Sequence, residues 1–250
     1  MVITLIVYLL GKFKIYKGTE SHLIRLSSMM DKIILTVSLL LVVVFHAAAQ
    51  KEYEVNIEDR EEAISLTQKG LQHIEAGNFL AAIADLEKAI SVDGTFHPAY
   101  INLYKAYNQT NVDKSKLLTI LEEGTYIFEE DDELTYYLGY LFYEKQDYAH
   151  AIKLFTRAIG YSKINGEDFH QVYGYHFNRG NAYLKTKEFQ RAITDYDYAL
   201  QLSPGNPDIL TNRGIAYYQV KNKDEACKNW NKSVSEGGMT AQKYIKQFCR

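Results

Sequence analysis

The chain has 250 residues, 47% of them apolar, which is enough for one or two domains with a hydrophobic core. Its formal net charge of −3 argues against a nucleic-acid-binding protein, because such a protein needs a basic surface to displace counterions. No HExxH, P-loop, GxGxxG or GxSxG pattern occurs, so we expect no enzyme, no cofactor and no small-molecule substrate.

The N-terminal segment has the pattern of an export signal. Residues 30–50 read MDKIILTVSLLLVVVFHAAAQ, with a lysine, an apolar run and three alanines in order. The apolar run is shorter than the roughly 20 residues of a membrane span. We predict a gene-model extension at 1–29, a signal peptide at 30–49, and an exported, periplasmic mature chain from Gln50. The alternative is an uncleaved anchor in the inner membrane, which the apolar start MVITLIVYLL favours.

The rest of the chain repeats itself. Gly180 is followed at offsets of 12, 16 and 19 by Ala192, Tyr196 and Ala199, which share one helix face because they step by four and three. The large residue at offset 16 varies, but the pattern recurs in four copies: Gly70 with Ala82 and Leu86, Gly139 with Ala151 and Phe155, Gly180 with Ala192 and Tyr196, and Gly214 with Ala226 and Trp230.

Each copy is predicted to be two antiparallel helices joined by a turn such as LKTKEF. Glycine is disfavoured inside a helix by about 1 kcal/mol, so its recurrence needs a packing reason. We expect Gly180 and Ala192 to be small because the two helix axes approach closely, and Tyr196 to fill the space further along.

A lead-in at 50–62 precedes five expected units, and a final helix follows them. The units are 63–96, 97–131, 132–165, 173–206 and 207–240, and the final helix is 241–250. The second unit is degenerate, with Tyr104 in place of glycine and with Lys116 and Glu123 in place of the alanines. An insertion near SKINGEDFHQVY should lengthen a helix or loop. In LSPGNPD we expect Gly205 at a helix end, then the cap Asn206 and Pro207.

These offsets resemble the tetratricopeptide repeat over about 63–240. The resemblance implies an all-α fold, a right-handed superhelical α-solenoid of helix-turn-helix repeats. The segment 241–250 is then the capping helix that covers the open apolar face of the last repeat. The signal layout, with Gln after its end, and the ACKNW…FC ending also resemble small exported repeat proteins of Bacteroidetes-type bacteria, which implies the periplasm.

The two cysteines, Cys227 and Cys249, lie in the last unit and in the capping helix. Export permits oxidation, so we predict a disulfide between them, with two buried free thiols as the alternative. We expect no metal site, because two cysteines without paired histidines are an incomplete ligand set. The remaining histidines, His73, His97, His150, His170 and His176, are interpreted as surface or groove residues. The acidic run 129–133 is interpreted as a solvated helix start.

The chain has 21 tyrosines, more than packing alone explains. First helices of tetratricopeptide arrays line a concave groove, and we place eight residues there: Tyr136, Tyr140, Tyr143, Phe177, Asn181, Lys185, Thr211 and Tyr218. Tyr and Asn suit peptide recognition, because they combine contact area with adaptable hydrogen bonds.

We therefore predict a non-enzymatic scaffold that binds a protein or peptide partner in the groove, in the cell envelope. The alternative is that this surface packs on residues 50–62 or on a second copy, which would make a structural or self-associating subunit of an envelope assembly. Binding of chaperone tails is not expected, because Phe177 and Thr211 stand where the clamp of some family members has lysine.

Overall fold

The computed structural model describes residues 55–166 and 171–249, so the predicted extension and signal peptide lie outside the described residues. All regular elements in these two ranges are helices, which confirms the all-α prediction there. They are α3 (Ile57–Glu75), α4 (Phe79–Val92), α5 (His97–Asn108), α6 (Ser115–Ile127), α7 (Asp132–Glu144), α8 (Tyr148–Asn165), α9 (Val172–Lys185), α10 (Phe189–Leu202), α11 (Pro207–Gln219), α12 (Lys223–Ser235), the 3-10 helix η2 (Met239–Ala241) and α13 (Gln242–Phe248).

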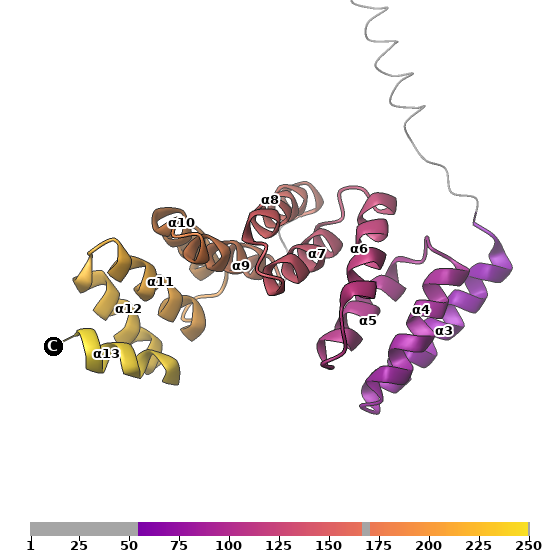
Figure 1. Ribbon diagram of the computed structural model, residues 1–250, viewed down its shortest axis with the longest axis horizontal. Coiled ribbons are helices and arrows are strands. Elements are labelled where there is room, and N and C mark those ends of the chain that lie inside the picture. The colour runs from indigo at the N-terminus through magenta and orange to yellow at the C-terminus, as the bar shows by residue number, and fades with distance from the viewer. Residues whose placement is uncertain (1–54, 167–170, 250) are drawn as a thin grey trace, which may run out of the picture. The chain divides into compact units, whose positions relative to one another are not determined.

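Consecutive helices pair as five hairpins, α3/α4 to α11/α12, and each hairpin packs on the next (Figure 1). Helix α3 starts at Ile57, inside the expected lead-in, because the side chain of Asn56 caps it by accepting a hydrogen bond from the amide of Glu58. The insertion lengthens α8, which continues to Asn165. The expected junction is confirmed: Gly205 has a positive φ, Asn206 caps α11 and Pro207 opens it.

In four hairpins the glycine makes room for the large side chain sixteen residues later. A Cβ atom on Gly180 would lie 2.7 Å from Cε1 of Tyr196, and one on Gly214 would lie 2.4 Å from Nε1 of Trp230. The same holds for Gly70 against Leu86 and for Gly139 against Phe155, and the alanines Ala82, Ala151, Ala192 and Ala226 are completely buried. Our expectation that the ring fills space further along was wrong: it lies directly over the glycine.

The second hairpin uses the same contact with its partners exchanged. Here the glycine is Gly124 on the second helix, and a Cβ there would lie 2.8 Å from Cδ1 of Tyr100 on the first. Tyr100 is buried, and its hydroxyl donates to the carbonyl of Gly94 at 2.9 Å. The packing of this unit is therefore not degenerate: the small residue lies on the second helix and the large residue on the first, the reverse of the other four hairpins.

Two asparagines hold neighbouring first helices together. Asn178 on α9 donates to the hydroxyl of Tyr136 on α7 at 2.7 Å, and Asn212 on α11 donates to the side-chain oxygen of Asn181 on α9 at 2.8 Å. Since Asn178 and Asn212 both stand two residues before a repeat glycine, each links its own hairpin to the preceding one.

The arginines that follow these asparagines hold the two helices of one hairpin together. Arg179 forms a two-pronged ion pair with the buried Asp195 on α10, at 2.7 and 2.8 Å. Arg213 donates to Asn229 on α12 at 2.8 Å. The repeated Asn-Arg-Gly is thus architectural: stacking between hairpins, a tie within the hairpin, and space for a ring.

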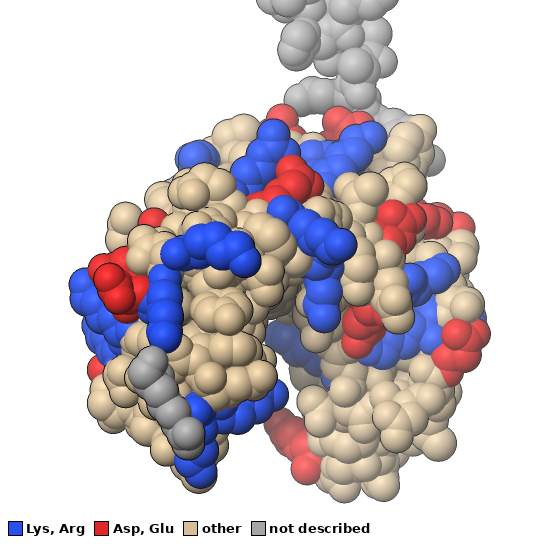
Figure 2. All heavy atoms as spheres, turned by 60° about the vertical axis from the view of Figure 1, so that its left-hand side comes forward, with Lys and Arg blue, Asp and Glu red and all other residues tan. Residues whose placement is uncertain are grey.

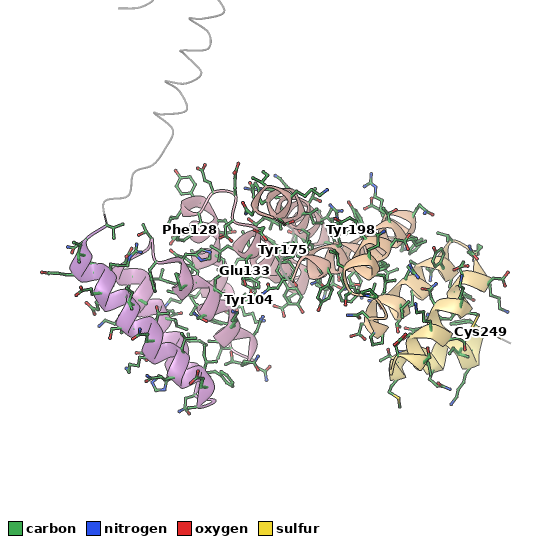
Figure 3. The ribbon with its side chains drawn as sticks, turned by 180° about the vertical axis from the view of Figure 1, so that it is seen from behind. Tyr104, Phe128, Glu133, Tyr175, Tyr198 and Cys249 are labelled. Carbon is green, nitrogen blue, oxygen red and sulfur yellow. A yellow bond between two sulfur atoms is a disulfide. The ribbon has the colours of Figure 1, made fainter. Side chains whose placement is uncertain are left out.

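Helix α13 covers the last hairpin, as expected of a cap. Its Tyr244 stacks on Trp230 with ring centroids 5.1 Å apart. The predicted disulfide between Cys227 and Cys249 is confirmed, with the two Cα atoms 5.7 Å apart. It ties the end of α13 to α12, at the C-terminal side of the molecule (Figure 3).

Candidate functional site

The candidate site is the solvent-facing side of the first helices α7, α9 and α11, which we call the inner surface. In the face that Figure 2 shows, Lys and Arg are interspersed with Asp and Glu, and the surface is hollowed beside the C-terminal hairpins. No single sign of charge dominates there.

Two of the eight predicted residues are already used in stacking hairpins. The hydroxyl of Tyr136 accepts from Asn178, and its ring lies 4.6 Å from that of Tyr175. The side-chain oxygen of Asn181 accepts from Asn212 and, at 2.9 Å, from the hydroxyl of Tyr196. Both residues fix the register of the inner surface, and their best polar atoms are already occupied.

Two other predicted residues do not lie open on the inner surface. Thr211 is buried: its hydroxyl donates to the carbonyl of Pro207 and lies 2.8 Å from the hydroxyl of Ser233 on α12. Tyr218 is covered by the cap, with its ring 4.4 Å from that of Phe248 on α13. The groove assignment was therefore wrong for Thr211, which faces the hairpin interior, whereas Tyr218 is half-buried against the cap.

Four predicted residues remain accessible. Tyr140 and Tyr143 on α7 are half-buried, and their rings are stacked with centroids 6.2 Å apart. Tyr148 continues the row, 5.4 Å from Tyr143. Phe177 on α9 is also half-buried, and Lys185, at the end of that helix, is exposed.

Tyr140 and Tyr143 keep their protons at neutral pH. Burial raises the pKa of both the Tyr140 and the Tyr143 hydroxyl. Neither hydroxyl has a hydrogen-bond partner among the described residues, so both can donate to a ligand. The arrangement offers aromatic contact area with two free donors at its edge.

Sequence reasoning missed Lys105 on α5. It follows Tyr104, as Tyr140 follows Gly139 and Asn181 follows Gly180, so the repeat register places it at the equivalent position. Lys105 is exposed, and neither it nor Lys185 forms an ion pair with a described residue. Tyr104 itself stacks on Tyr137 with centroids 3.8 Å apart (Figure 3 labels Tyr104). The repeat register alone would have assigned Lys105 to this position, but the second unit has no glycine there from which to count.

Two buried polar clusters between helices are structural. His176, for which we expected solvent or groove exposure, is buried with its Nδ1 3.1 Å from Oδ1 of Asp195. Asp132, expected to be solvated, is also buried and accepts from the hydroxyl of Tyr175 at 2.8 Å, since α7 and α9 meet there. Asp131 does cap α7, accepting from the amide of Leu134.

Other kinds of site find little support in the described ranges. A shallow pocket of about 200 Å³ lies between the second and third hairpins, but its Lys114 and Glu144 neutralise each other at 2.8 Å. Across 55–166 and 171–249, no three His, Cys, Asp or Glu side chains gather as a metal site. None of the helices in these ranges is long and apolar enough to cross a membrane.

Stacked hairpins, each sealed by a glycine under a large side chain, define the class as a helical-repeat solenoid. Residues 180–221 match the family model described as TPR repeat, so this part of the chain is similar to tetratricopeptide (TPR) repeats. The match contains Gly180, the Tyr196 contact and Gly214.

Curated relatives match over short stretches. The chain is 34% identical over 65 residues to "Stress-induced-phosphoprotein 1" of Caenorhabditis elegans, covering 26% of this chain and 20% of that protein. It is 38% identical over 58 residues to "Hsp70-Hsp90 organizing protein" of Triticum aestivum, covering 23% of this chain and 10% of that protein. The chain thus spans a fifth or less of the length of these relatives.

Solved structures match over most of the described part. A MamA protein aligns with a TM-score of 0.61 at 21% identity, covering 73% of this chain and 95% of that chain. YrrB, described as a TPR protein with an unusual peptide-binding site, aligns at 0.60 and 19%, covering 76% and 95%. Pseudomonas aeruginosa PilF aligns at 0.62 and 19%, covering 73% and 79%. At these identities the likeness shows the shared solenoid fold.

Proposed function

We propose that this protein is a non-catalytic scaffold that binds a peptide or protein partner on its inner surface, in the cell envelope. The observation that carries the proposal is the aromatic row on α7. Tyr140 and Tyr143 are half-exposed, and their hydroxyls are unused by the described fold, whereas Tyr136 and Asn181 are used. Large rings with free donors bind peptides at low entropic cost.

The neighbouring helix completes the surface. Phe177 on α9 presents a further ring, and Lys185 an unpaired cation, at the same side of the repeat register. The description of YrrB as peptide-binding supports this reading by analogy of fold. The name of the wheat relative points to chaperones, but Phe177 and the buried Thr211 replace the lysines that a tail clamp would need.

Export is part of the proposal and has its own support. The signal-peptide pattern at 30–49 precedes a domain whose two cysteines are bonded, and a disulfide persists in an oxidising compartment. Mass spectrometry of the exported protein should identify Gln50 as the first residue. A peptide that contains Leu39 in that protein would contradict cleavage.

The test of the inner surface is a matched pair of variants. Partners captured from envelope extract are first identified by mass spectrometry, and binding of the purified partner is then measured by calorimetry. Tyr140→Ala with Phe177→Ala should weaken binding at least tenfold and leave the helical circular dichroism signal unchanged. Tyr126→Ala, an exposed tyrosine on the second helix α6, is the control and should bind normally. Unchanged affinity in the double variant would exclude the inner surface.

Self-association is the second candidate, because α3 carries an exposed apolar stripe. Ile57, Ile64 and Leu71 are seven residues apart, and the first is 74% exposed. Light scattering after size exclusion should then show a dimer that Ile64→Lys abolishes. A monomer at all concentrations would remove this alternative.

A further inference from the structure

Helix α13 is seated on the surface of the last hairpin and not built into its core. None of its seven residues is fully buried. Its contacts are aromatic: Tyr244 stacks on Trp230, and Phe248 lies 4.4 Å from Tyr218 and 6.0 Å from Trp230. Its lysines, Lys243 and Lys246, form no ion pair with the described residues. The helix is therefore held by these rings, by the packing of Ile245 against the same apolar cluster, and by the disulfide.

The surface beneath α13 would stay formed without it. The indole nitrogen of Trp230 donates to the carbonyl of Thr211 at 3.1 Å, and its ring fills the space over Gly214. Tyr218 projects from α11, and its neighbour Ile215 packs against the same cluster. Removing α13 would leave an aromatic surface already shaped to hold the helix that it now holds.

Two features flank this helix: a closely packed glycine turn before it and a disulfide at its end. Gly237 has a φ of +90°, and Gly238 packs so closely on Ser233 that a Cβ would lie 2.1 Å from its hydroxyl oxygen. Ala241 is completely buried, which anchors the chain up to the start of α13. From Gln242 to Cys249, the last described residue, the covalent tie besides the backbone is the bond between Cys227 and Cys249, 22 residues apart.

We propose that α13 is a redox-latched lid over a second binding site, separate from the aromatic row on α7. While the disulfide is closed, α13 itself occupies the site. A dithiol reductant opens the bond: one thiolate attacks a cysteine sulfur, the mixed disulfide resolves, and two electrons and two protons pass to the protein. The products are two protein thiols and a cyclic disulfide of the reductant.

After reduction, α13 is held in the docked state by its apolar and aromatic contacts alone. A helix of seven residues is marginal by itself in water. The closed disulfide favours the docked arrangement, because it removes conformational freedom that α13 would otherwise gain on undocking. The freed site then accepts an amphipathic helix that repeats the pattern of its own lid, with aromatic residues at i and i+4, as Tyr244 and Phe248 are spaced.

Trp230 is the single tryptophan of the chain, so its fluorescence reports on the lid directly. The purified protein is compared in the oxidised form, after dithiothreitol, and after reoxidation, with thiol counting to verify each state. We expect acrylamide quenching of Trp230 to rise at least twofold on reduction and to revert on reoxidation. Hydrogen exchange in 242–248 should accelerate, whereas α9 and α10 stay protected.

A second measurement tests the site. A fluorescein-labelled peptide of residues 239–250, with Cys249→Ser, should bind the reduced protein and the Cys227→Ser/Cys249→Ser variant, and not the oxidised protein. If the double variant fails to fold, the reversible reduction of the natural chain still decides. Equal quenching in both redox states would overturn the lid, and absence of peptide binding to the opened protein would overturn the site. Both readouts leave Tyr140 and Phe177 untouched, so the proposed function stands or fails separately.

Discussion

Substituting Gly180 by alanine tests the packing rule of the repeats, and Gly160 provides the control. Both glycines lie within helices, α9 and α8. A Cβ on Gly180 would come within 2.7 Å of Cε1, 3.0 Å of Cδ1 and 3.2 Å of Cζ of Tyr196. A Cβ on Gly160 would meet nothing within 4 Å. The two substitutions are chemically identical and differ only in what the added methyl group contacts.

The magnitudes follow from two opposing effects. Replacing glycine by alanine inside a helix gains about 1 kcal/mol at either position. At Gly180 the ring of Tyr196 cannot move cheaply, because it is completely buried and its hydroxyl donates to Asn181. Overpacking of this kind costs about 1–3 kcal/mol. Gly160→Ala should therefore stabilise by about 1 kcal/mol, and Gly180→Ala should be neutral or destabilise by up to about 2 kcal/mol.

Urea denaturation followed by circular dichroism measures both variants, with hydrogen exchange to locate the loss in the fourth hairpin. In a Tyr196→Leu background the cost of Gly180→Ala should fall by about 1 kcal/mol or more, because the colliding ring is gone. If Gly180→Ala stabilised the protein as much as Gly160→Ala does, close packing under the ring could not be the reason for glycine at this repeat position.

Three further predictions concern a turn, an ion pair and a stacking bond. Lys221 has a φ of 66° in the turn after α11, so Lys221→Gly should raise the free energy of unfolding by about 1 kcal/mol, and an unchanged urea midpoint would contradict strain there. The hydrogen bond with Asp131 raises the pKa of His97. This pair therefore stabilises the fold below the unfolded-state pKa of about 6.5, and its contribution is lost as pH rises through the raised value. His97→Gln should flatten the fall in Tm between about pH 6 and 9, and the same slope of Tm against pH in the variant and the natural protein would argue against the pair. Asn178→Ala should cost about 1–3 kcal/mol in urea denaturation by stranding the hydroxyl of Tyr136, and much less in a Tyr136→Phe background; equal costs would deny the bond.

The second hairpin marks the limit of an offset pattern. Its first helix carries Tyr104 where the pattern has glycine, so the sequence alone indicates a degenerate unit. The structure shows the same small-against-large contact between Gly124 and Tyr100, with the partners on opposite helices. When the small and the large residue exchange helices, their contact is kept, but their spacing along the sequence changes. An offset pattern therefore misses the contact, and only the three-dimensional structure shows it.

The inner surface shows a different limit. Helical register alone placed Tyr140, Tyr143, Phe177 and Lys185 where they remain accessible. The same register could not tell that Thr211 bonds to Ser233 within its hairpin, or that Asn181 is engaged by the next first helix. Whether a polar side chain is free depends on partners from other helices, which periodicity does not specify.

The amino-acid sequence by itself indicated the hairpins, the junction at Gly205 to Pro207 and the cap, and it offered the pairing of Cys227 with Cys249 beside two free thiols, between which the structure decided. The hairpins follow from local periodicity, the junction from its turn residues, and the candidate cysteine pair from a count of two cysteines. All three signals can be taken from the sequence without knowing which helices meet in space. The tertiary structure alone decided which aromatic rings stay open to a partner and which are covered by α13. Exposure is a property of the packed whole, because each helix loses surface only to the neighbours that the fold brings against it.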